Sequence, residues 1–254
     1  MSEAHAKNLS YYSGKILREA NNCNPTTDEA QHIAAQILLG ETSKSNKRLK
    51  LIALEYWMKY IGRPIHFKKP RATKRNPKYL TEEQMTLIIR ASKNYRDATI
   101  LELLCSTGMR VGELRELNLE DLDFSNGVIR IRHGKGDKER EVYMTEECRR
   151  FLNAYVERWE IAQGALFVSN KGNRISKNAL WSVIHETAIL AGLPSTSPHV
   201  LRHSYATCFA GKNDNVFILQ ELLGHSTIEM TKRYYHSNRE VKRKGAMIGA
   251  PTML

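Results

Sequence analysis

The sequence is poor in cysteine and contains no long apolar run. Its cysteines are scattered, with no C-x-x-C pair and no cluster of His and Cys: Cys23, Cys105, Cys148 and Cys208. This excludes a disulfide framework and a four-ligand zinc-type site. No apolar run approaches the length of a membrane span, and the first residues lack the basic-then-apolar pattern of a signal peptide. We therefore expect a soluble, cytoplasmic protein with no membrane partner.

Acidic residues are outnumbered by basic ones. Lys and Arg total 39 of the 254 residues and Asp and Glu total 27, which leaves a net charge of +12. Such a surplus favours a polyanionic partner, either nucleic acid or an anionic membrane surface. No long amphipathic basic helix supports the membrane, so nucleic acid is the leading expectation. A solvated positive face remains the alternative.

The first part of the chain, residues 1–65, has helical patterns only. Thr26 to Glu29 has the form of a capping box, in which side chain and backbone cap each other at the start of a helix. A second helix is expected near Lys47 to Ile61. The apolar residues that recur at helical spacing in these two segments are Ile33, Ala34, Ile37, Leu38, Leu51, Leu54, Met58 and Ile61. We expect a small helical bundle.

Residues 66–79 have a different composition and are predicted to be a basic linker. Prolines interrupt any helix here, and no acidic residue occurs between Gly62 and Leu80. Two interpretations fit this pattern equally: a solvated tether, or a strap that lies along DNA phosphates. The strap is an option because clustered like charges repel one another unless a polyanion neutralises them. The candidate DNA-binding residues are Lys68, Lys69, Arg71, Lys74 and Arg75.

Residues 80–254 are predicted to be mainly helical with a small β-sheet, an α+β fold. Two runs, 128–132 and 140–144, alternate at period two and predict a β-hairpin with Lys135 near its tip. Residues 166–168 predict a further short strand. Gly108 is expected to end a helix, and Glu113 is expected to be the structural partner of a basic group.

Two segments near the C-terminus contain signals for the starts and ends of helices. Ser197 and Pro198 predict the start of a helix, which places His199 in its first turn and Arg202 one turn later on the same face. Gly224 is expected to end another helix. A capping box from Ser226 to Glu229 is then expected to start the last one, with a tyrosine pair about two turns inside it.

Metal-free transfer at a phosphodiester needs cations for the phosphate oxygens, a nucleophile, a base and an acid for the leaving oxygen. A partly buried Arg202 would be costly without an anion, and its planar fork suits phosphate. His199 near a helix N-terminus should be biased towards its neutral, proton-accepting form, although His199 and His203 also fit as ordinary polar residues of a helix. The full candidate set, in chain order, is Arg110, Lys135, His199, Arg202, His225 and Tyr234.

Five short motifs in this region carry a resemblance to a known family. They are T-G-M-R-V-G-E-L, G-K-G-D-K-E-R, H-V-L-R, L-G-H and T-K-R-Y-Y-H. Residues 80–236 therefore resemble the catalytic domain of tyrosine recombinases, also called the phage integrase family. In that family the nucleophile lies nine residues after the L-G-H histidine. Since 234 − 225 = 9, the resemblance selects Tyr234 over Tyr235.

The resemblance implies a complete reaction scheme. The nucleophile would attack a DNA phosphate to give a 3′-phosphotyrosine and a free 5′-hydroxyl. Arg110 and Arg202 would hold the phosphate, and His225 would donate to a non-bridging oxygen. His199 would act as the base, and Lys135 would protonate the leaving 5′ oxygen. No metal or nucleotide cofactor is implied, and attack by another strand's 5′-hydroxyl would exchange strands through a Holliday junction.

The same resemblance implies the partners. Residues 1–65 would be the family's core-binding domain, residues 66–79 the linker, and residues 80–254 the catalytic domain, together enclosing double-stranded DNA. The expected assembly is a homo-tetramer on two DNA sites, with the C-terminal tail docking on a neighbouring subunit or else simply frayed. The compact layout, without an added N-terminal arm-binding module, is most similar to the Xer type, whose task is chromosome-dimer resolution.

Two alternatives stay open from the sequence. Integration of a mobile element, or a type IB topoisomerase activity, would use the same strand cleavage with a different acceptor for the DNA end. A catalytically inactive DNA-binding protein is the alternative from another class. That alternative predicts gaps in the catalytic set, and the sequence has none.

Overall fold

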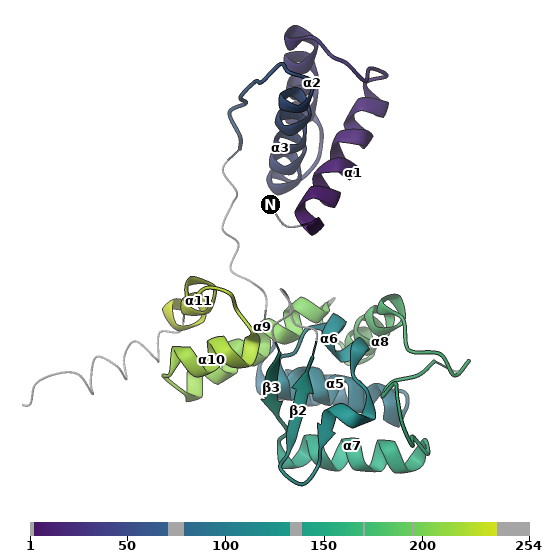
Figure 1. Ribbon diagram of the computed structural model, residues 1–254. Coiled ribbons are helices and arrows are strands. Elements are labelled where there is room, and N and C mark those ends of the chain that lie inside the picture. The colour runs from purple at the N-terminus through teal and green to yellow at the C-terminus, as the bar shows by residue number, and fades with distance from the viewer. Residues whose placement is uncertain (1–2, 71–78, 133–138, 170, 195, 238–254) are drawn as a thin grey trace, which may run out of the picture. The chain divides into compact units, whose positions relative to one another are not determined.

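The computed structural model describes residues 3–70, 79–132, 139–169, 171–194 and 196–237, with side chains from residue 9 to residue 235 (Figure 1). The chain divides into two compact units, Met1–Asn76 and Pro77–Leu254, here the N-terminal and C-terminal units. Within the described ranges, no helix combines the length and apolarity needed to cross a membrane.

The N-terminal unit is a bundle of helices α1 (Glu3–Glu19), α2 (Thr27–Leu39) and α3 (Lys44–Tyr60). The predicted capping box is confirmed, because Thr26 and Glu29 cap each other at the start of α2. Helix α3 begins earlier than expected, since Ser43 accepts a hydrogen bond from the Asn46 backbone and caps it. The bundle encloses a core of Leu9, Ile16, Ala30, Ile33, Ala34, Leu51, Ala53, Leu54 and Met58.

The segment after α3 packs back onto this bundle. Ile65 and Phe67 lie against its core. The Phe67 backbone N–H donates to Glu55 Oε1 at 2.8 Å, and Lys69 Nζ lies 2.5 Å from the same oxygen. The first residues of the predicted linker therefore contact the N-terminal unit. Of the candidate linker residues, Lys68 is exposed, and Arg71, Lys74 and Arg75 lie outside the described ranges.

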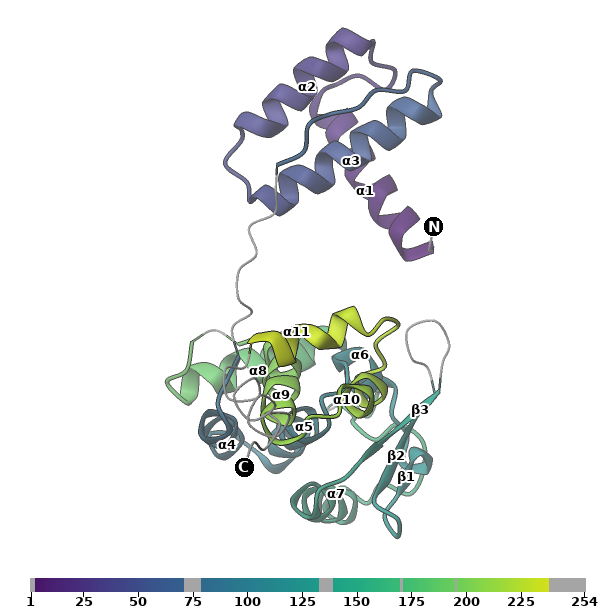
Figure 2. The same ribbon diagram turned by 90° about the vertical axis from the view of Figure 1, so that its left-hand side faces the viewer.

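The C-terminal unit is mostly helical with a small sheet, which confirms the predicted fold class. Its central helix, α5, is buried along most of its length and packs against α4, α7 and α9 (Figure 2). Gly108 ends α5 in the left-handed conformation, as expected. The helices here are α4 (Glu82–Arg90), α5 (Tyr95–Thr107), α6 (Val111–Glu116), α7 (Glu146–Arg158), α8 (Lys177–Leu190), α9 (Pro198–Lys212), α10 (Val216–Leu223) and α11 (Glu229–Ser237), with a 3-10 turn, η1 (Leu119–Asp121).

The sheet has the antiparallel order β1 (Leu122–Asp123), β2 (Val128–Ile131) and β3 (Arg140–Tyr143). Ile129 pairs with Val142, and both face the core, which confirms the two predicted strands of the hairpin. The short β1 was not expected. The strand predicted at 166–168 is wrong: the described residues have only isolated bridges there, at Ala165 and Val168, and Leu166 and Phe167 are apolar because they fill the core.

The last two described helices meet at a tight turn. Gly224 ends α10 with φ of 60°, as expected, but the predicted capping box after it is wrong. Helix α11 begins only at Glu229, and the backbone N–H groups of Thr231 and Lys232 bond to the carbonyl of Ile228. Ser226 instead donates to the sulfur of Met230. The extra residues before α11 form the extended turn that carries His225.

Candidate active site

Tyr234 lies inside the group formed by α9, α10 and α11. Its side chain is 3% exposed and packs with Ala206, Ala210, Leu219 and Leu223. The phenol oxygen is not in apolar surroundings, however. It lies 2.6 Å from Nδ1 of His203 and receives a hydrogen bond of 3.0 Å from Arg233. The buried ring thus presents its hydroxyl to a polar cluster.

Arg202 is a buried cation on α9, with 8% of its surface exposed. Its Nη1 donates to the carbonyl of Gly108 at 2.7 Å, and its Nη2 donates to the carbonyl of Leu223 at 2.5 Å. No carboxylate forms an ion pair with it among the described residues. Burial, and then the charge of Arg110, lower its pKa to about 10, so it stays charged at neutral pH. The expected burial of Arg202 is therefore confirmed.

Two further arginines reach the same turn. Arg110, just before α6, donates through Nη2 to the carbonyl of Gly224 at 3.0 Å. Arg140, on β3, donates through Nε to the carbonyl of Leu222 at 2.9 Å. Arg140 was not a candidate from the sequence, because nothing in a short alternating strand distinguishes one arginine from its exposed neighbours. Only the packing of β3 against α10 identifies it.

Three arginines from three elements thus bind successive carbonyls, those of residues 222–224. These carbonyls end α10 and have no partner within the helix, and they form the negative end of its dipole. Arginine is a suitable partner because its rigid fork can bond several acceptors in fixed directions. The C-terminus of α10 therefore gathers Arg110, Arg140 and Arg202 around the turn before His225.

Glu113 balances part of this charge. It is 6% exposed, accepts from Arg110 at 2.7 Å, and accepts from both terminal nitrogens of Arg140 at 2.9 and 2.7 Å. Burial alone would raise the pKa of this carboxyl, but the hydrogen bonds and charge of Arg140, followed by those of Arg110, lower it. The prediction that Glu113 is a structural partner of a basic group is confirmed.

His225 follows the turn and is 8% exposed. Its Nδ1 lies 2.8 Å from the hydroxyl of Thr231, and its ring is nearly parallel to that of Tyr234, with 6.4 Å between centroids. Burial, and then the charges of Arg202 and Arg233, lower its pKa to about 4. At neutral pH the ring is uncharged, and its Nε2 is the nitrogen not taken by Thr231.

The remaining sequence candidates are placed less centrally. His199 is exposed near the start of α9, although Arg202 one turn later is buried. Within the described residues no hydrogen bond joins His199 to Tyr234. Lys135 lies outside the described ranges. Lys69 is occupied by its ion pair with Glu55, so a contact with DNA would have to share or break that pair.

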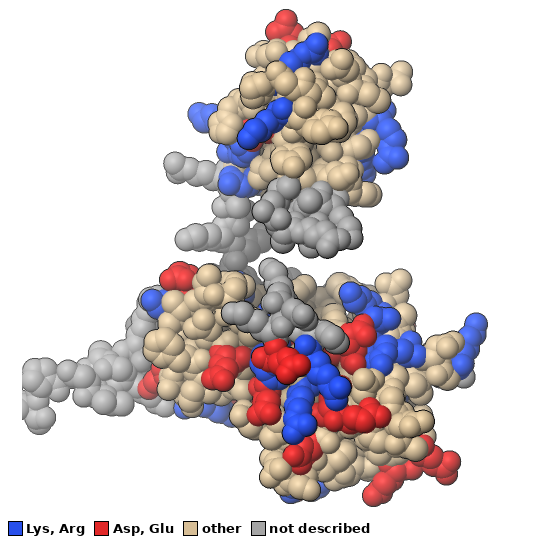
Figure 3. All heavy atoms as spheres, in the orientation of Figure 1, with Lys and Arg blue, Asp and Glu red and all other residues tan. Residues whose placement is uncertain are grey.

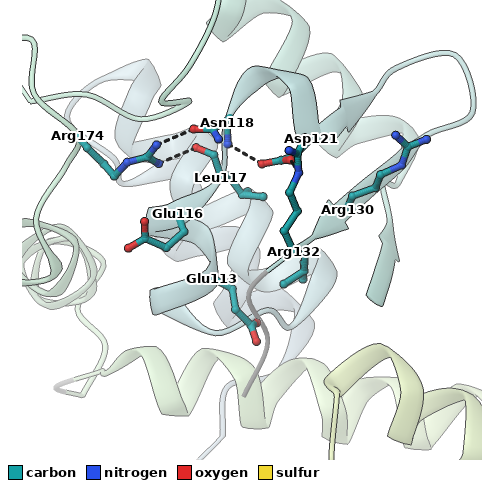
Figure 4. Close-up of a pocket in the computed structure, with 9 residues that line it drawn as sticks. Glu113, Glu116, Leu117, Asn118, Asp121, Arg130, Arg132 and Arg174 are labelled. Atoms are coloured by element: carbon teal, nitrogen blue, oxygen red, sulfur yellow. Dashed lines mark hydrogen bonds and ion pairs between the residues drawn. The ribbon is translucent and has the colours of Figure 1, made fainter. Parts of the chain in front are cut away.

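A pocket of about 180 Å³ lies next to Glu113 (Figure 4). The charged groups that line it already have partners. Arg174 donates to the carbonyl of Leu117 at 3.0 Å and to Asn118 Oδ1 at 2.6 Å, and Arg132 lies 2.5 Å from Asp121. Acidic and basic side chains are likewise interspersed on the face shown in Figure 3. We therefore do not assign this pocket to the candidate site, although Glu113 borders both.

The comparisons with known proteins agree with this arrangement. The model of the phage integrase family matches residues 78–240, which is most of the C-terminal unit and more than half of the chain. This chain belongs to the phage integrase family. As a member, it is a tyrosine recombinase, an enzyme that cleaves and rejoins DNA.

Relatives of this recombinase extend over nearly the whole chain. The tyrosine recombinase XerA of Pyrococcus horikoshii is 31% identical over 230 residues, 88% of this chain and 80% of that protein. XerD of Staphylococcus aureus is 30% identical over 263 residues, covering 96% and 85%. A crystal structure of XerA recombinase aligns with a TM-score of 0.63 at 27% identity, covering 100% of this chain and 94% of the other. The Tn1549 transposon integrase in complex with DNA shares the fold, with a TM-score of 0.75 at 20% identity, covering 96% and 94%.

The second tyrosine of the recombinase has a different role. The Tyr235 hydroxyl donates to the carbonyl of Asn215 at 3.0 Å and so holds α11 to the turn before α10. Burial raises the pKa of Tyr235 to about 12. In contrast, the hydroxyl of Tyr234 faces a histidine and an arginine. The contacts of both hydroxyls favour Tyr234 over Tyr235 as the nucleophile, which is the choice predicted from the sequence.

Proposed function

We propose that this recombinase acts at specific DNA sites through Tyr234, which attacks a DNA phosphate to form a 3′-phosphotyrosine and release a 5′-hydroxyl. The observation that carries the proposal is the buried Arg202 beside the Tyr234 cluster. Its described partners are neutral carbonyls, which offset the cost of burying a cation only in part. A phosphodiester supplies the missing anion.

Arg110 and Arg202 hold the phosphate in this proposal. Each guanidinium has five N–H donors, and the carbonyls of the turn fix its orientation while leaving donors for phosphate oxygens. Arg140 has a different task, because Glu113 and the Leu222 carbonyl engage both its terminal nitrogens and its Nε. It orients Glu113, which in turn orients Arg110.

Two further groups complete the charge stabilisation. His225 donates from Nε2 to a non-bridging oxygen, and the Thr231 hydroxyl donates to its Nδ1, which carries no proton in this tautomer. Lys135 protonates the leaving 5′ oxygen, as the family resemblance implies. The family scheme gives the role of base to His199, but its exposed position near the start of α9 suits a contact with the DNA backbone.

The wider activity follows from reversibility. The phosphotyrosine keeps the energy of the broken bond, so a 5′-hydroxyl from a second duplex can attack it and exchange strands through a Holliday junction. We propose double-stranded DNA as the partner, with a homo-tetramer on two sites in the cytoplasm. The basic segment 66–79 would follow DNA phosphates, and the C-terminal tail, which lies outside the described ranges, would dock on a neighbouring subunit. The XerH structures that this chain resembles in fold are bound to their difH substrate.

The test is capture of a covalent protein–DNA adduct in EDTA from a pool of randomised duplexes and from supercoiled plasmid. Wild type and Tyr235→Phe should give a protease-sensitive adduct, and Tyr234→Phe should give none. Sequencing the captured DNA defines the site. An adduct that persists in Tyr234→Phe and disappears in Tyr235→Phe would overturn the assigned nucleophile. Binding without any adduct would favour the inactive DNA-binding alternative.

A further inference from the structure

One of the two polar groups described at the Tyr234 hydroxyl is His203, which the sequence does not distinguish from an ordinary helix residue. It directly follows Arg202 on α9 and is half-buried. Its Nδ1 lies 2.6 Å from the phenol oxygen, the shorter of the two hydrogen bonds described there. The rings of His203 and Tyr234 lie 5.6 Å apart between centroids. His203 therefore touches the atom that would attack the phosphate.

The directions of the two hydrogen bonds follow from the chemistry of the donors. Arg233 has no acceptor, so the phenol oxygen accepts at that contact. A buried hydroxyl also needs an acceptor for its own hydrogen. Nδ1 of a neutral His203 fills this role, which places the ring's remaining proton on Nε2. The phenol thus accepts from a cation on one side and donates to an imidazole on the other.

The surroundings keep His203 neutral. Burial, and then the positive charges of Arg233, His199 and Arg202, lower its pKa to about 4. The charged or titratable groups that face it come from α9, α11 and the turn after α10. They are His199, Arg202, Arg233, Tyr234 and His225. A bound phosphate would neutralise part of the arginine charge and so make His203 a better base when DNA is present.

We propose that His203 accepts the proton of Tyr234 during strand cleavage, an inference that rests on the proposed role of Tyr234 as the nucleophile. The phenol oxygen forms a bond to phosphorus while the bond from phosphorus to the 5′ oxygen breaks. The phenol proton moves to Nδ1 of His203, and the leaving oxygen takes its proton from a separate acid, for which Lys135 is the candidate. In ligation the attacking 5′-hydroxyl gives its proton back to the acid that protonated the 5′ oxygen in cleavage, and His203 returns the phenol proton to the tyrosine as the bond from phosphorus to the phenol oxygen breaks.

Two other histidines are less suited to this step. His199 is exposed, and no hydrogen bond joins it to Tyr234 within the described residues. His225 has Nδ1 occupied by Thr231, and its nearly parallel ring is offset from that of Tyr234 at 6.4 Å. Arg233 assists His203, because a guanidinium that donates to the phenol oxygen stabilises the developing phenolate.

The test compares His203→Asn with His199→Asn in single-turnover adduct formation on the captured site, from pH 5 to 9. Asparagine places its Oδ1 close to the position of Nδ1, so it keeps the hydrogen bond but takes up no proton. We expect His203→Asn to bind DNA normally and to form adduct about 10²- to 10⁴-fold more slowly at pH 7. Its rate should rise about tenfold per pH unit, because the phenol must then ionise unaided.

A DNA substrate with sulfur at the 5′ bridging position separates base from acid. Sulfur leaves without protonation, so the defect of an acid disappears with this substrate, whereas the defect of His203→Asn should persist. A His203→Asn enzyme with the wild-type rate and pH profile would overturn the proposal, as would the base signature appearing in His199→Asn instead. Adduct formation by Tyr234→Phe would overturn the proposed function itself, which is a different result.

A measurement without DNA gives an independent check. Nitrogen-15 NMR of histidine-labelled protein at pH 7 shows which ring nitrogen of His203 carries the proton, with the signal assigned by its loss in His203→Asn. We expect a protonated Nε2 and an unprotonated, hydrogen-bonded Nδ1. A proton on Nδ1 would mean that His203 only tethers the phenol oxygen, and would overturn the proposal.

Discussion

Replacing Glu113 by glutamine tests whether one buried carboxylate holds the arginines of the active site in place. Glu113 accepts hydrogen bonds from the Arg110 backbone, the Arg110 side chain and both terminal nitrogens of Arg140. Glutamine keeps the shape but replaces one oxygen by an NH₂ group, which would face donors. It also removes the one carboxylate that, among the described residues, pairs with Arg110 and Arg140.

The expected loss follows from these contacts. Removing one partner of a buried ion pair costs about 3 to 5 kcal/mol, because the remaining charge stays buried. For a unit of this size 1 kcal/mol corresponds to about 2 to 4 °C in Tm, so we expect Glu113→Gln to lower the Tm of the C-terminal unit by roughly 6 to 20 °C. Sulfate should restore part of the loss by occupying the phosphate site between Arg110 and Arg202.

The assay is thermal unfolding followed by circular dichroism, with and without sulfate, together with adduct formation. Glu116→Gln is the matched control, because Glu116 lies on the same short helix, is exposed and, among the residues that the structure describes, pairs with the partly exposed Arg115 alone. We expect the control to change stability by less than about 0.5 kcal/mol. If Glu113→Gln melts like the control and forms adduct normally, the arginines do not depend on this carboxylate and the reasoning fails.

Three further predictions follow from the contacts of other residues. Gly108→Ala should destabilise the C-terminal unit by about 3 kcal/mol or more in chemical denaturation, because φ is 63° and a Cβ would collide with the Tyr205 ring. Gly172→Ala, with positive φ but open space, is the control. Stability should fall as pH drops from 6.5 to 4, because unfolded His203 and His225 bind protons that the folded forms, with pKa values of about 4, do not. The two histidines together should account for a loss of folding free energy on the order of 2 kcal/mol after allowing for screening. This part of the pH dependence should be absent from a His203→Asn/His225→Asn double variant. Glu55→Gln should release the segment that ends at Lys69 from the N-terminal bundle. The expected result is faster tryptic cleavage at this segment while α2 and α3 stay intact. Unchanged cleavage would show that the packing of Ile65 and Phe67 is sufficient to hold the segment.

Much of this molecule is readable from local sequence, for identifiable physical reasons. A helix start depends on a side chain that caps neighbouring N–H groups, so Thr26 and Ser197 mark theirs reliably. Gly108 and Gly224 mark helix ends because a left-handed residue is needed there. The two strands of the hairpin follow from alternation alone. The capping rule failed where the side chain had another partner. The hydroxyl of Ser226 bonds to Met230 instead of capping α11.

The residues of the candidate site also fall into two groups, those that the sequence motifs identify and those that only the packing identifies. The motifs in the chain determine which residue types are present and in what order, and this suffices to select Arg110, Arg202, His225 and Tyr234. They do not determine what each side chain contacts, because those contacts join residues far apart in the sequence. Only the packing of β3, α6 and α9 around the end of α10 brings Arg140 to Glu113, and only the packing of α11 against α9 places His203 on the Tyr234 hydroxyl.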